Sequence, residues 1–195
     1  MTPYPSIMID QWKEEVAREP ELIRKQELWR LVERYQDQGH GSCMVRNPVA
    51  AKIVQDNLLH HHGSLFVLHD WIVMPNHVHV LLTPHAGASL ERITHACKSY
   101  TSHEIERRLG GEGRLWEPDY FDRLIRNERH FEGVSHYIRR NPVKAGLVQD
   151  ATLWVYGSAS PRMKEKLEGT FTDEPSVNRG AGGPPAPRYG SPALR

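Results

Sequence analysis

Apolar and charged positions alternate at helical spacing in the first part of the chain. Residues 10–38 fit one or two amphipathic helices, and Pro20 is the expected break between them because proline lacks a backbone N–H. Asn47 followed by Pro48 is typical of a helix start, since asparagine caps N–H groups and proline suits the first helical position. This pattern predicts a further helix that runs to about residue 61.

After Gly63 the spacing of apolar positions changes to that of β-strands. Residues 65–74 and residues 77–83 are both rich in apolar and β-branched side chains. Pro75 and Asn76 separate the two runs and are residues that favour turns. The pattern therefore predicts a β-hairpin in this part of the chain.

Two more helices and one more strand are predicted after the hairpin. Ser89 can cap a helix, and apolar positions at helical spacing continue from it to about residue 109. Residues 116–125 are interpreted as a strand with polar interruptions. Residues 128–140 fit a helix that Pro142 should stop, because the residue before a proline disfavours helical angles.

The order of these elements predicts an α+β fold, with a ferredoxin-like antiparallel sheet that carries its helices on one face. Residues 1–39 would form an N-terminal helical segment, and residues 40–158 would form the main domain. Residues 159–195 lose the pattern, and their Gly- and Pro-rich composition is typical of a disordered tail.

The composition is that of an ordinary globular protein. The 195 residues are 38% hydrophobic and 25% charged. There is no run of about 18 apolar residues that would span a membrane, and the N-terminus lacks the basic and apolar regions of a secretory signal. Cys43 and Cys97 lie far apart and predict neither a disulfide framework nor a zinc knuckle, so a reducing cytoplasm is the expected compartment.

Charge is distributed unevenly, although the net charge of the chain is only +1. Residues 1–39 carry a net charge of −2, whereas residues 123–148 carry a net charge of +4. A local basic patch favours a phosphate-bearing partner, but a solvated helix face has the same pattern. Charge alone therefore leaves both interpretations open.

Two histidines in the second predicted strand are candidate metal ligands. His77 and His79 are two residues apart, so both side chains point to one face of a strand, where two imidazoles can hold a divalent metal. The alternative is two exposed histidines on an open sheet face. The adjacent histidines at positions 60–62 would fan out around a helix, and they are interpreted as a polar helix end.

Tyr137 and Asn141 lie four residues apart on the last predicted helix, and therefore share a face. A tyrosine hydroxyl is a poor nucleophile for a phosphate unless a cation stabilises the developing charge. If this face lies over the sheet, Asn141 can offer a metal an oxygen ligand, with Tyr137 one turn away. The alternative is that Tyr137 is a core aromatic, and Tyr100 and Tyr120 are other candidate tyrosines.

Three sequence blocks together resemble the single-tyrosine HUH transposases. They are WIVMPNHVHVLL at residues 71–82, WEPDYFDRLIR at residues 116–126 and YIRRNPVKAGLV at residues 137–148. Their order and spacing are similar to those of the IS200-like transposase superfamily, and in particular to its branch of REP-associated tyrosine transposases. The resemblance covers about residues 40–158.

This resemblance implies a function and a set of site residues. His77, His79 and Asn141 would bind a divalent metal, either Mg²⁺ or Mn²⁺, which suits two imidazoles with an amide oxygen. Tyr137 would attack a phosphate of single-stranded or hairpin DNA and leave a 5′-phosphotyrosine and a free 3′-hydroxyl. The expected DNA contacts are basic and aromatic side chains, namely Arg123, Arg126, Arg139, Arg140, Lys144, Trp116 and Tyr120.

The N-terminus departs from the family pattern. Family members usually begin with a β-strand that is central in the sheet, whereas residues 1–6 contain two prolines and a helical pattern follows at once. Either residues 4–9 form a poor substitute or the first strand is missing, as an N-terminal truncation would cause. A missing central strand would leave backbone groups of its neighbours unpaired and would put activity in doubt.

Two other functions remain open on the sequence. One is a non-catalytic, DNA-hairpin-binding remnant of a transposase, and the other is a metal-dependent hydrolase that uses water in place of tyrosine. On each interpretation the expected location is the bacterial cytoplasm, in association with the nucleoid. A homodimer is one of the assemblies that the sequence allows.

Overall fold

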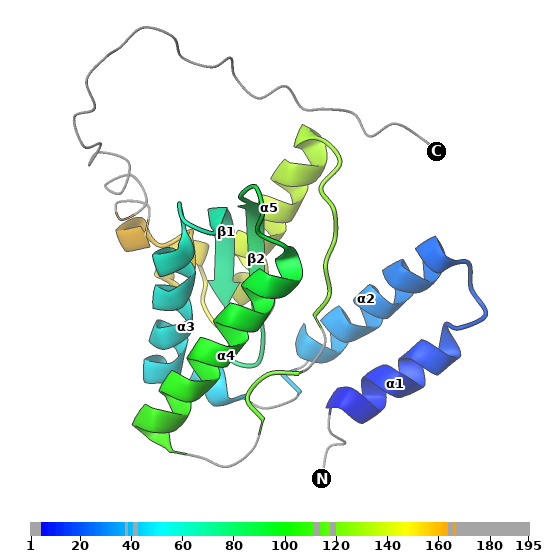
Figure 1. Cartoon of the computed structure of the whole chain (residues 1–195), viewed down its shortest axis with the longest axis horizontal. Coiled ribbons are helices and arrows are strands. Elements are labelled where there is room, and N and C mark those ends of the chain that lie inside the picture. The colour runs from blue at the N-terminus through cyan, green and yellow to red at the C-terminus, as the bar shows by residue number, and fades with distance from the viewer. Residues whose placement is uncertain are drawn as a thin grey trace, which may run out of the picture.

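The computed structural model describes residues 5–37, 39–40, 43–110, 114–117, 120–163 and 166. The described part of the chain begins with a pair of helices, continues into a helix, a hairpin and a second helix, and ends with a long helix and a short segment after it (Figure 1). None of the described helices is long and apolar enough to cross a membrane.

The first two helices are α1 (Pro5–Glu15) and α2 (Glu21–Asp37), which lie side by side with Pro20 between them, as predicted (Figure 1). Ile9 and Val16 are buried, and Trp12 meets Tyr35 edge to face with ring centroids 5.5 Å apart. The suggestion of a substitute strand at residues 4–9 is wrong for residues 5–9, which are helical. A proline suits the first turn of a helix because its φ is already helical.

Two capped helices follow in agreement with the sequence pattern. A short 3-10 turn, η1 (Cys43–Arg46), leads into α3 (Pro48–His61), where the Asn47 side chain accepts a hydrogen bond from the backbone N–H of Val49 at 2.9 Å. Ser89 caps α4 (Leu90–Leu109) by accepting from the backbone N–H of Arg92 at 3.2 Å. Each cap satisfies an N–H group that has no partner within its helix, which explains why both helices begin where the sequence predicts.

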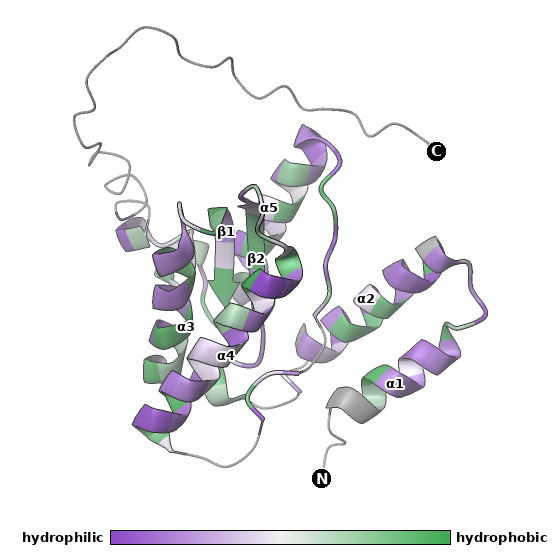
Figure 2. Ribbon diagram, in the orientation of Figure 1, coloured by the Kyte–Doolittle hydropathy of each residue, from purple (hydrophilic) through white to green (hydrophobic). Residues whose placement is uncertain are grey.

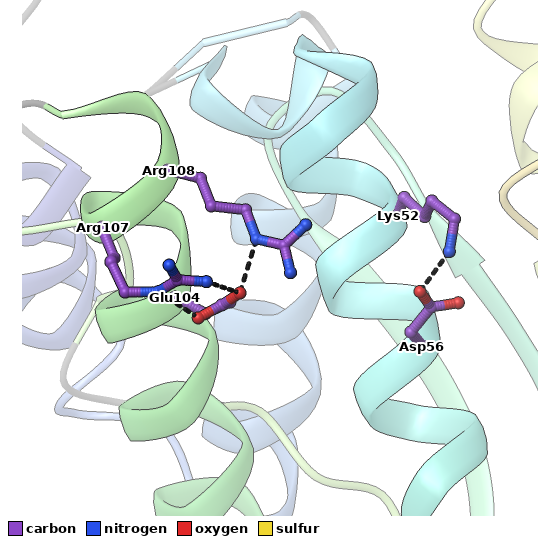
Figure 3. A network of polar contacts seen from close by, with 5 residues as sticks. All are labelled: Lys52, Asp56, Glu104, Arg107 and Arg108. Atoms are coloured by element: carbon purple, nitrogen blue, oxygen red, sulfur yellow. Dashed lines mark hydrogen bonds and ion pairs between the residues drawn. The ribbon is translucent and has the colours of Figure 1, made fainter.

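The outer surfaces of α3 and α4 carry charged side chains. On α4, Glu104 accepts from Arg107 and Arg108, and on α3, Lys52 pairs with Asp56 (Figure 3). Hydrogen bonds from the two guanidinium groups lower the pKa of Glu104 to about 2. Ion pairs of this exposed kind contribute little to stability, and they mark the faces of these helices that point to solvent.

The predicted hairpin is confirmed as β1 (Phe66–Val73) and β2 (Val78–Pro84), which pair antiparallel with Ile72 opposite His79. A bulge at residue 69 shifts the register between Leu68 and Asp70. One extra residue at this point exchanges the two faces of the strand. Phe66 and Leu68 before the bulge therefore share a core with Trp71 and Val73 after it.

Helices cover both faces of the hairpin. One core contains residues of α3, α4 and β1, with Val78 and Val80 packed against it, whereas Ile72 and Leu81 form a second core with Ile138 of α5 (Glu128–Lys144). Figure 1 shows α3 and α4 on one side of the strands and α5 behind them, and in Figure 2 hydrophobic residues occupy much of β1. The α+β class is confirmed, but the helices do not share one face, because both faces of the strands carry apolar side chains that must be buried.

The segment that joins α4 to α5 contradicts the predicted strand at 116–125. Residues 114–117 and 120–126 have no regular secondary structure, and the described residues form a sheet of two strands only. Tyr120, Phe121 and Leu124 are exposed, so the segment has no continuous apolar face to bury. It is held instead by side chains: Trp116 Nε1 donates to Thr101 Oγ1 at 2.9 Å.

The last helix runs past the predicted stop. The side chain of Asn127 caps its start by accepting from the backbone N–H of His130 at 2.8 Å, and Pro142 lies inside the helix. Pro142 is fully buried, and the backbone N–H of Ala145 still donates to the Asn141 carbonyl at 2.9 Å. Burial in the core outweighs the local preference of proline, and this keeps Asn141 helical.

The C-terminal segment covers the outer edge of β1. After the 3-10 turn η2 (Ala151–Leu153), the backbone of Val73 donates to Tyr156 at 2.8 Å and Ser158 donates to Trp71 at 3.0 Å. Ala159 and Met163 are buried, so the packed part of the chain extends beyond the boundary predicted at 158. Residues 164–165 and 167–195 of the predicted tail lie outside the described residues.

Candidate metal and nucleophile site

Two histidines, one just before β2 and one within it, face the long helix α5. The ring centroids of His77 and His79 are 4.7 Å apart, and the planes are inclined at 71°. His77 is only 5% exposed. Alternation along the strand places both rings on the side of Leu81, which packs in the core beneath α5. The interpretation as two exposed histidines on an open sheet face is therefore wrong.

Tyr137 of α5 lies next to His79, with ring centroids 5.4 Å apart and an interplanar angle of 70°. Its ring packs at the edge of the core formed by Ile72, Leu81 and Ile138. The rings of Tyr137 and His77 thus lie on either side of the His79 ring, although the tyrosine is about sixty residues from the histidines in sequence. This proximity depends on α5 packing against the hairpin.

Asn141 is one helical turn after Tyr137 and is 1% exposed. Among the described residues, neither Oδ1 nor Nδ2 of Asn141 has a hydrogen-bond partner, and the same is true of His77 Nε2. A buried polar atom without a partner costs about 1–3 kcal/mol, so native proteins rarely keep one without a use. Nε2 of His79 and the hydroxyl of Tyr137 are also buried.

The hairpin turn fixes the orientation of His77. His77 Nδ1 donates to Asn76 Oδ1 at 2.9 Å, and Asn76 Nδ2 donates to the backbone carbonyls of Gln36 at 2.9 Å and His40 at 2.8 Å. Burial lowers the pKa of His77 to about 4. The imidazole is therefore neutral at neutral pH and presents a lone pair at Nε2, as a metal ligand requires.

The donor atoms suit a divalent cation. Among the described residues, no group of three or more His, Cys, Asp or Glu side chains is placed to hold a metal ion. A metal at this site would therefore take two imidazole nitrogens and an oxygen from Asn141 or from a substrate. This mixed nitrogen and oxygen set fits Mg²⁺ or Mn²⁺, and the buried His77 Nε2 and Asn141 Oδ1 supply lone pairs for it.

Helix α2 also borders the site, which the sequence pattern did not indicate. Trp29 lies beside Tyr137 with ring centroids 6.5 Å apart, and the guanidinium carbon of Arg123 lies 5.8 Å from the Trp29 ring centroid. The ammonium nitrogen of Lys144 is 5.3 Å from the centroid of the Tyr137 ring. Of the predicted DNA contacts, Lys144 thus lies beside the candidate nucleophile, and Arg123 lies beside its neighbour Trp29.

The other predicted DNA contacts have varied surroundings. Arg126 and Arg140 are exposed, and Tyr120 is 39% exposed with the Lys98 ammonium 5.9 Å from its ring centroid. Trp116 is half-buried against α4.

Arg139 has a structural partner. Its Nε and Nη2 donate to the two carboxylate oxygens of Asp70 at 2.7 and 3.2 Å, and Ser158 donates to the same carboxylate at 2.6 Å. Asp70 is 1% exposed. This ion pair joins α5, β1 and the C-terminal segment, so Arg139 has a role in the fold that its sequence context did not reveal.

The histidines at positions 60–62 form a helix end, as predicted. His60 is exposed, and His62 lies just after α3, where its Nδ1 accepts a hydrogen bond from the backbone N–H of Leu68 at 3.0 Å. Burial lowers the pKa of both His61 and His62. The cluster belongs to the junction between α3 and β1, away from Tyr137.

Comparison with known proteins identifies the family of the chain. Residues 45–141, which include both histidines and Tyr137, match the family described as "Transposase IS200 like", and the chain belongs to this family. A curated relative, the REP-associated tyrosine transposase of Escherichia coli (strain K12), is 26% identical over 102 residues. The match covers 48% of this chain and 54% of the relative, so the chain spans about half of that relative's length. No solved structure matches the chain significantly.

Proposed function

We propose that the protein cleaves and rejoins DNA strands, with Tyr137 as the nucleophile and a divalent metal held by His77, His79 and Asn141. The observation that carries this proposal is the series of three rings, with centroids 4.7 and 5.4 Å apart, that ends on the tyrosine. The buried polar atoms of His77 and Asn141 that have no hydrogen-bond partner among the described residues support a bound metal at the same place. A core aromatic cluster of ordinary kind would contain apolar residues at these positions.

The proposed reaction is an in-line displacement at phosphorus. The Tyr137 oxygen forms a bond to phosphorus, the bond from phosphorus to the 3′-oxygen breaks, and the tyrosine proton passes through solvent to that 3′-oxygen. The products are a 5′-phosphotyrosine and a free 3′-hydroxyl. When bound, the metal supplies Lewis-acid stabilisation of the charge that develops on the phosphate.

Side chains near the tyrosine have separate proposed tasks. Lys144, whose ammonium nitrogen lies 5.3 Å from the centroid of the Tyr137 ring, would contact the phosphate, and Arg123, beside Trp29, would contact a neighbouring part of the DNA backbone. Trp29 confines the ring of Tyr137 from the side of α2. The exposed ring of Tyr120 offers a surface on which an unpaired base can stack. We therefore propose single-stranded DNA beside a hairpin as the substrate.

The test is covalent capture. The protein is incubated with a labelled hairpin-bearing single-stranded oligonucleotide and Mn²⁺, and a band that survives SDS is the expected phosphotyrosine adduct. Tyr137→Phe should abolish it, and Tyr120→Phe is the matched control that should retain it. The same reaction with Mg²⁺ or with EDTA shows whether a metal is needed and which one serves.

Each other outcome points to a different function. Oligonucleotide cleavage without an adduct would favour a hydrolase that uses water. Binding without cleavage would favour a non-catalytic hairpin-binding protein. An adduct that persists in Tyr137→Phe would refute the assignment of the nucleophile.

A further inference from the structure

A hydrogen-bonded chain connects the end of α2 to His77. The side-chain nitrogen of Asn76 donates to two backbone carbonyls, those of Gln36 and His40, and the oxygen of the same amide faces His77 Nδ1. Carbonyl oxygens only accept hydrogen bonds, so the pair of carbonyls fixes which end of the Asn76 amide is the nitrogen. The orientation of Asn76 is therefore determined by the backbone that surrounds it.

This orientation decides where His77 carries its proton. The Asn76 oxygen can only accept, so the hydrogen must lie on Nδ1 of the neutral imidazole, and Nε2 must carry the lone pair. Nε2 is buried, and no described residue donates to it. The end of α2 thus selects the imidazole tautomer in which the buried nitrogen can bind a cation.

We infer that Asn76 is a positioning residue for His77, and that the turn formed by Gln36, Gly39 and His40 is part of the metal site. The inference rests on the proposed function, since it concerns the metal that His77 would hold. Asn76 does not touch the metal in this scheme. It acts by fixing the ring orientation and tautomer of His77 through the carbonyls at the end of α2.

The turn at the end of α2 depends on a glycine. Gly39 has φ of +77° and its N–H donates to the Gln36 carbonyl at 2.9 Å, the same carbonyl that accepts from Asn76. A residue with a side chain is strained at positive φ, and a β-branched one most of all. A substitution at Gly39 should therefore displace the carbonyls that hold Asn76, although it lies far from the histidines in sequence.

The first test reads the tautomer directly in the metal-free protein. Nitrogen chemical shifts of selectively ¹⁵N-labelled histidines distinguish Nδ1–H from Nε2–H, and His77→Gln assigns the signal. The wild type should show Nδ1–H for His77, and Asn76→Ala should lose this preference. An Nε2–H tautomer in the wild type, or an unchanged tautomer in Asn76→Ala, would overturn the inference.

The second test measures the Mn²⁺ affinity of the full chain by calorimetry. Asn76→Ala should bind Mn²⁺ about 10–100-fold more weakly than the wild type, which is the usual effect of losing a residue that orients a metal-binding histidine. Gly39→Val should weaken binding in the same direction. Gly87→Val is the matched control, because Gly87 also has positive φ, at +83°, and open space around its Cβ position.

The outcomes separate this inference from the proposed function. A wild type that binds no Mn²⁺, or a His77→Ala variant that binds as well as the wild type, would refute the proposed metal site. Wild-type affinity in Asn76→Ala and Gly39→Val, with loss in His77→Ala, would refute only the role of Asn76. Equal weakening in Gly39→Val and Gly87→Val would show a general loss of stability and would also refute it.

Discussion

The ion pair between Arg139 and Asp70 gives the sharpest prediction about stability. Asp70 is 1% exposed and accepts two hydrogen bonds from Arg139 and one from Ser158, whereas the side chain of Arg139 is 46% exposed. Of the two described residues that donate to the Asp70 carboxylate, Arg139→Ala would leave only Ser158. The substitution removes the positive charge that compensates the buried carboxylate.

The magnitude follows from these surroundings. Breaking a fully buried ion pair by removing one partner costs about 3–5 kcal/mol. The guanidinium here is half-exposed, so water can enter in its place, and Ser158 keeps its hydrogen bond. The expected loss in the free energy of unfolding is therefore about 2–3 kcal/mol.

The assay is urea unfolding of Arg139→Ala against Arg140→Ala, the adjacent exposed arginine on the same helix. Arg140→Ala should change the free energy of unfolding by less than about 0.5 kcal/mol. Adding Asp70→Asn to Arg139→Ala should recover about 1 kcal/mol or more, because the neutral amide removes the uncompensated charge. A loss below about 0.5 kcal/mol in Arg139→Ala, or no recovery in the double variant, would refute the reasoning.

The same variants separate a structural role of Arg139 from DNA contact. If Arg139 acts only through Asp70, Arg139→Ala should bind single-stranded DNA like the wild type at temperatures where both are folded. Arg140→Ala, which is expected to keep its stability, should bind more weakly if its exposed guanidinium contacts phosphate. Weaker DNA binding by folded Arg139→Ala would show that its exposed side also serves the nucleic acid.

Three further results are expected. The pKa of His77 in the folded protein is about 4 and lies below the ordinary value of 6.5, so the unfolded chain binds this proton at a higher pH than the folded protein does. In EDTA, the free energy of unfolding should therefore fall by up to about 3 kcal/mol as pH falls from 6.5 to 4. His77→Gln should reduce that loss. A Cβ at Gly157 would lie 2.4 Å from Ile72 Cδ1, so Gly157→Ala should destabilise by about 1–3 kcal/mol in thermal melts, and Ile72→Val should partly restore stability. Trp29→Ala should uncover Tyr137 and speed its nitration by tetranitromethane, measured on the Tyr137 peptide by mass spectrometry, and an unchanged rate would contradict the shielding role of Trp29.

Local interactions made the early part of the structure predictable. The caps at Asn47 and Ser89 lie within two or three residues of the N–H groups they satisfy, so the sequence alone determined where α3 and α4 begin. Alternation along a strand placed His77 and His79 on one face, and helical periodicity placed Tyr137 and Asn141 on one face. Each of these inferences concerns residues that are close together in the chain.

Tertiary contacts decided the features that the pattern left open or misplaced. Residues 116–125 have strand-like composition, but 116–117 and 120–125 are irregular, because no neighbouring strand or buried face is available to them among the described residues. Pro142 lies inside α5, because its burial in the core outweighs the local preference against a helical residue before proline. For Pro142 the energy of long-range packing exceeded a local propensity of a few kcal/mol at most, whereas in the irregular segment a local β-propensity had no long-range packing to support it.

The site shows the same division. The sequence by itself identified the four candidate side chains. It also placed His77 and His79 on one face of a strand, and Tyr137 and Asn141 on one face of a helix. Only the packing of α5 on the hairpin brought the ring centroids of His79 and Tyr137 to 5.4 Å from each other. Only the end of α2 and the turn after it placed the carbonyls of Gln36 and His40 where they accept from Asn76. Contacts between segments forty to sixty residues apart depend on which surfaces are buried together, and no periodicity within one segment encodes that.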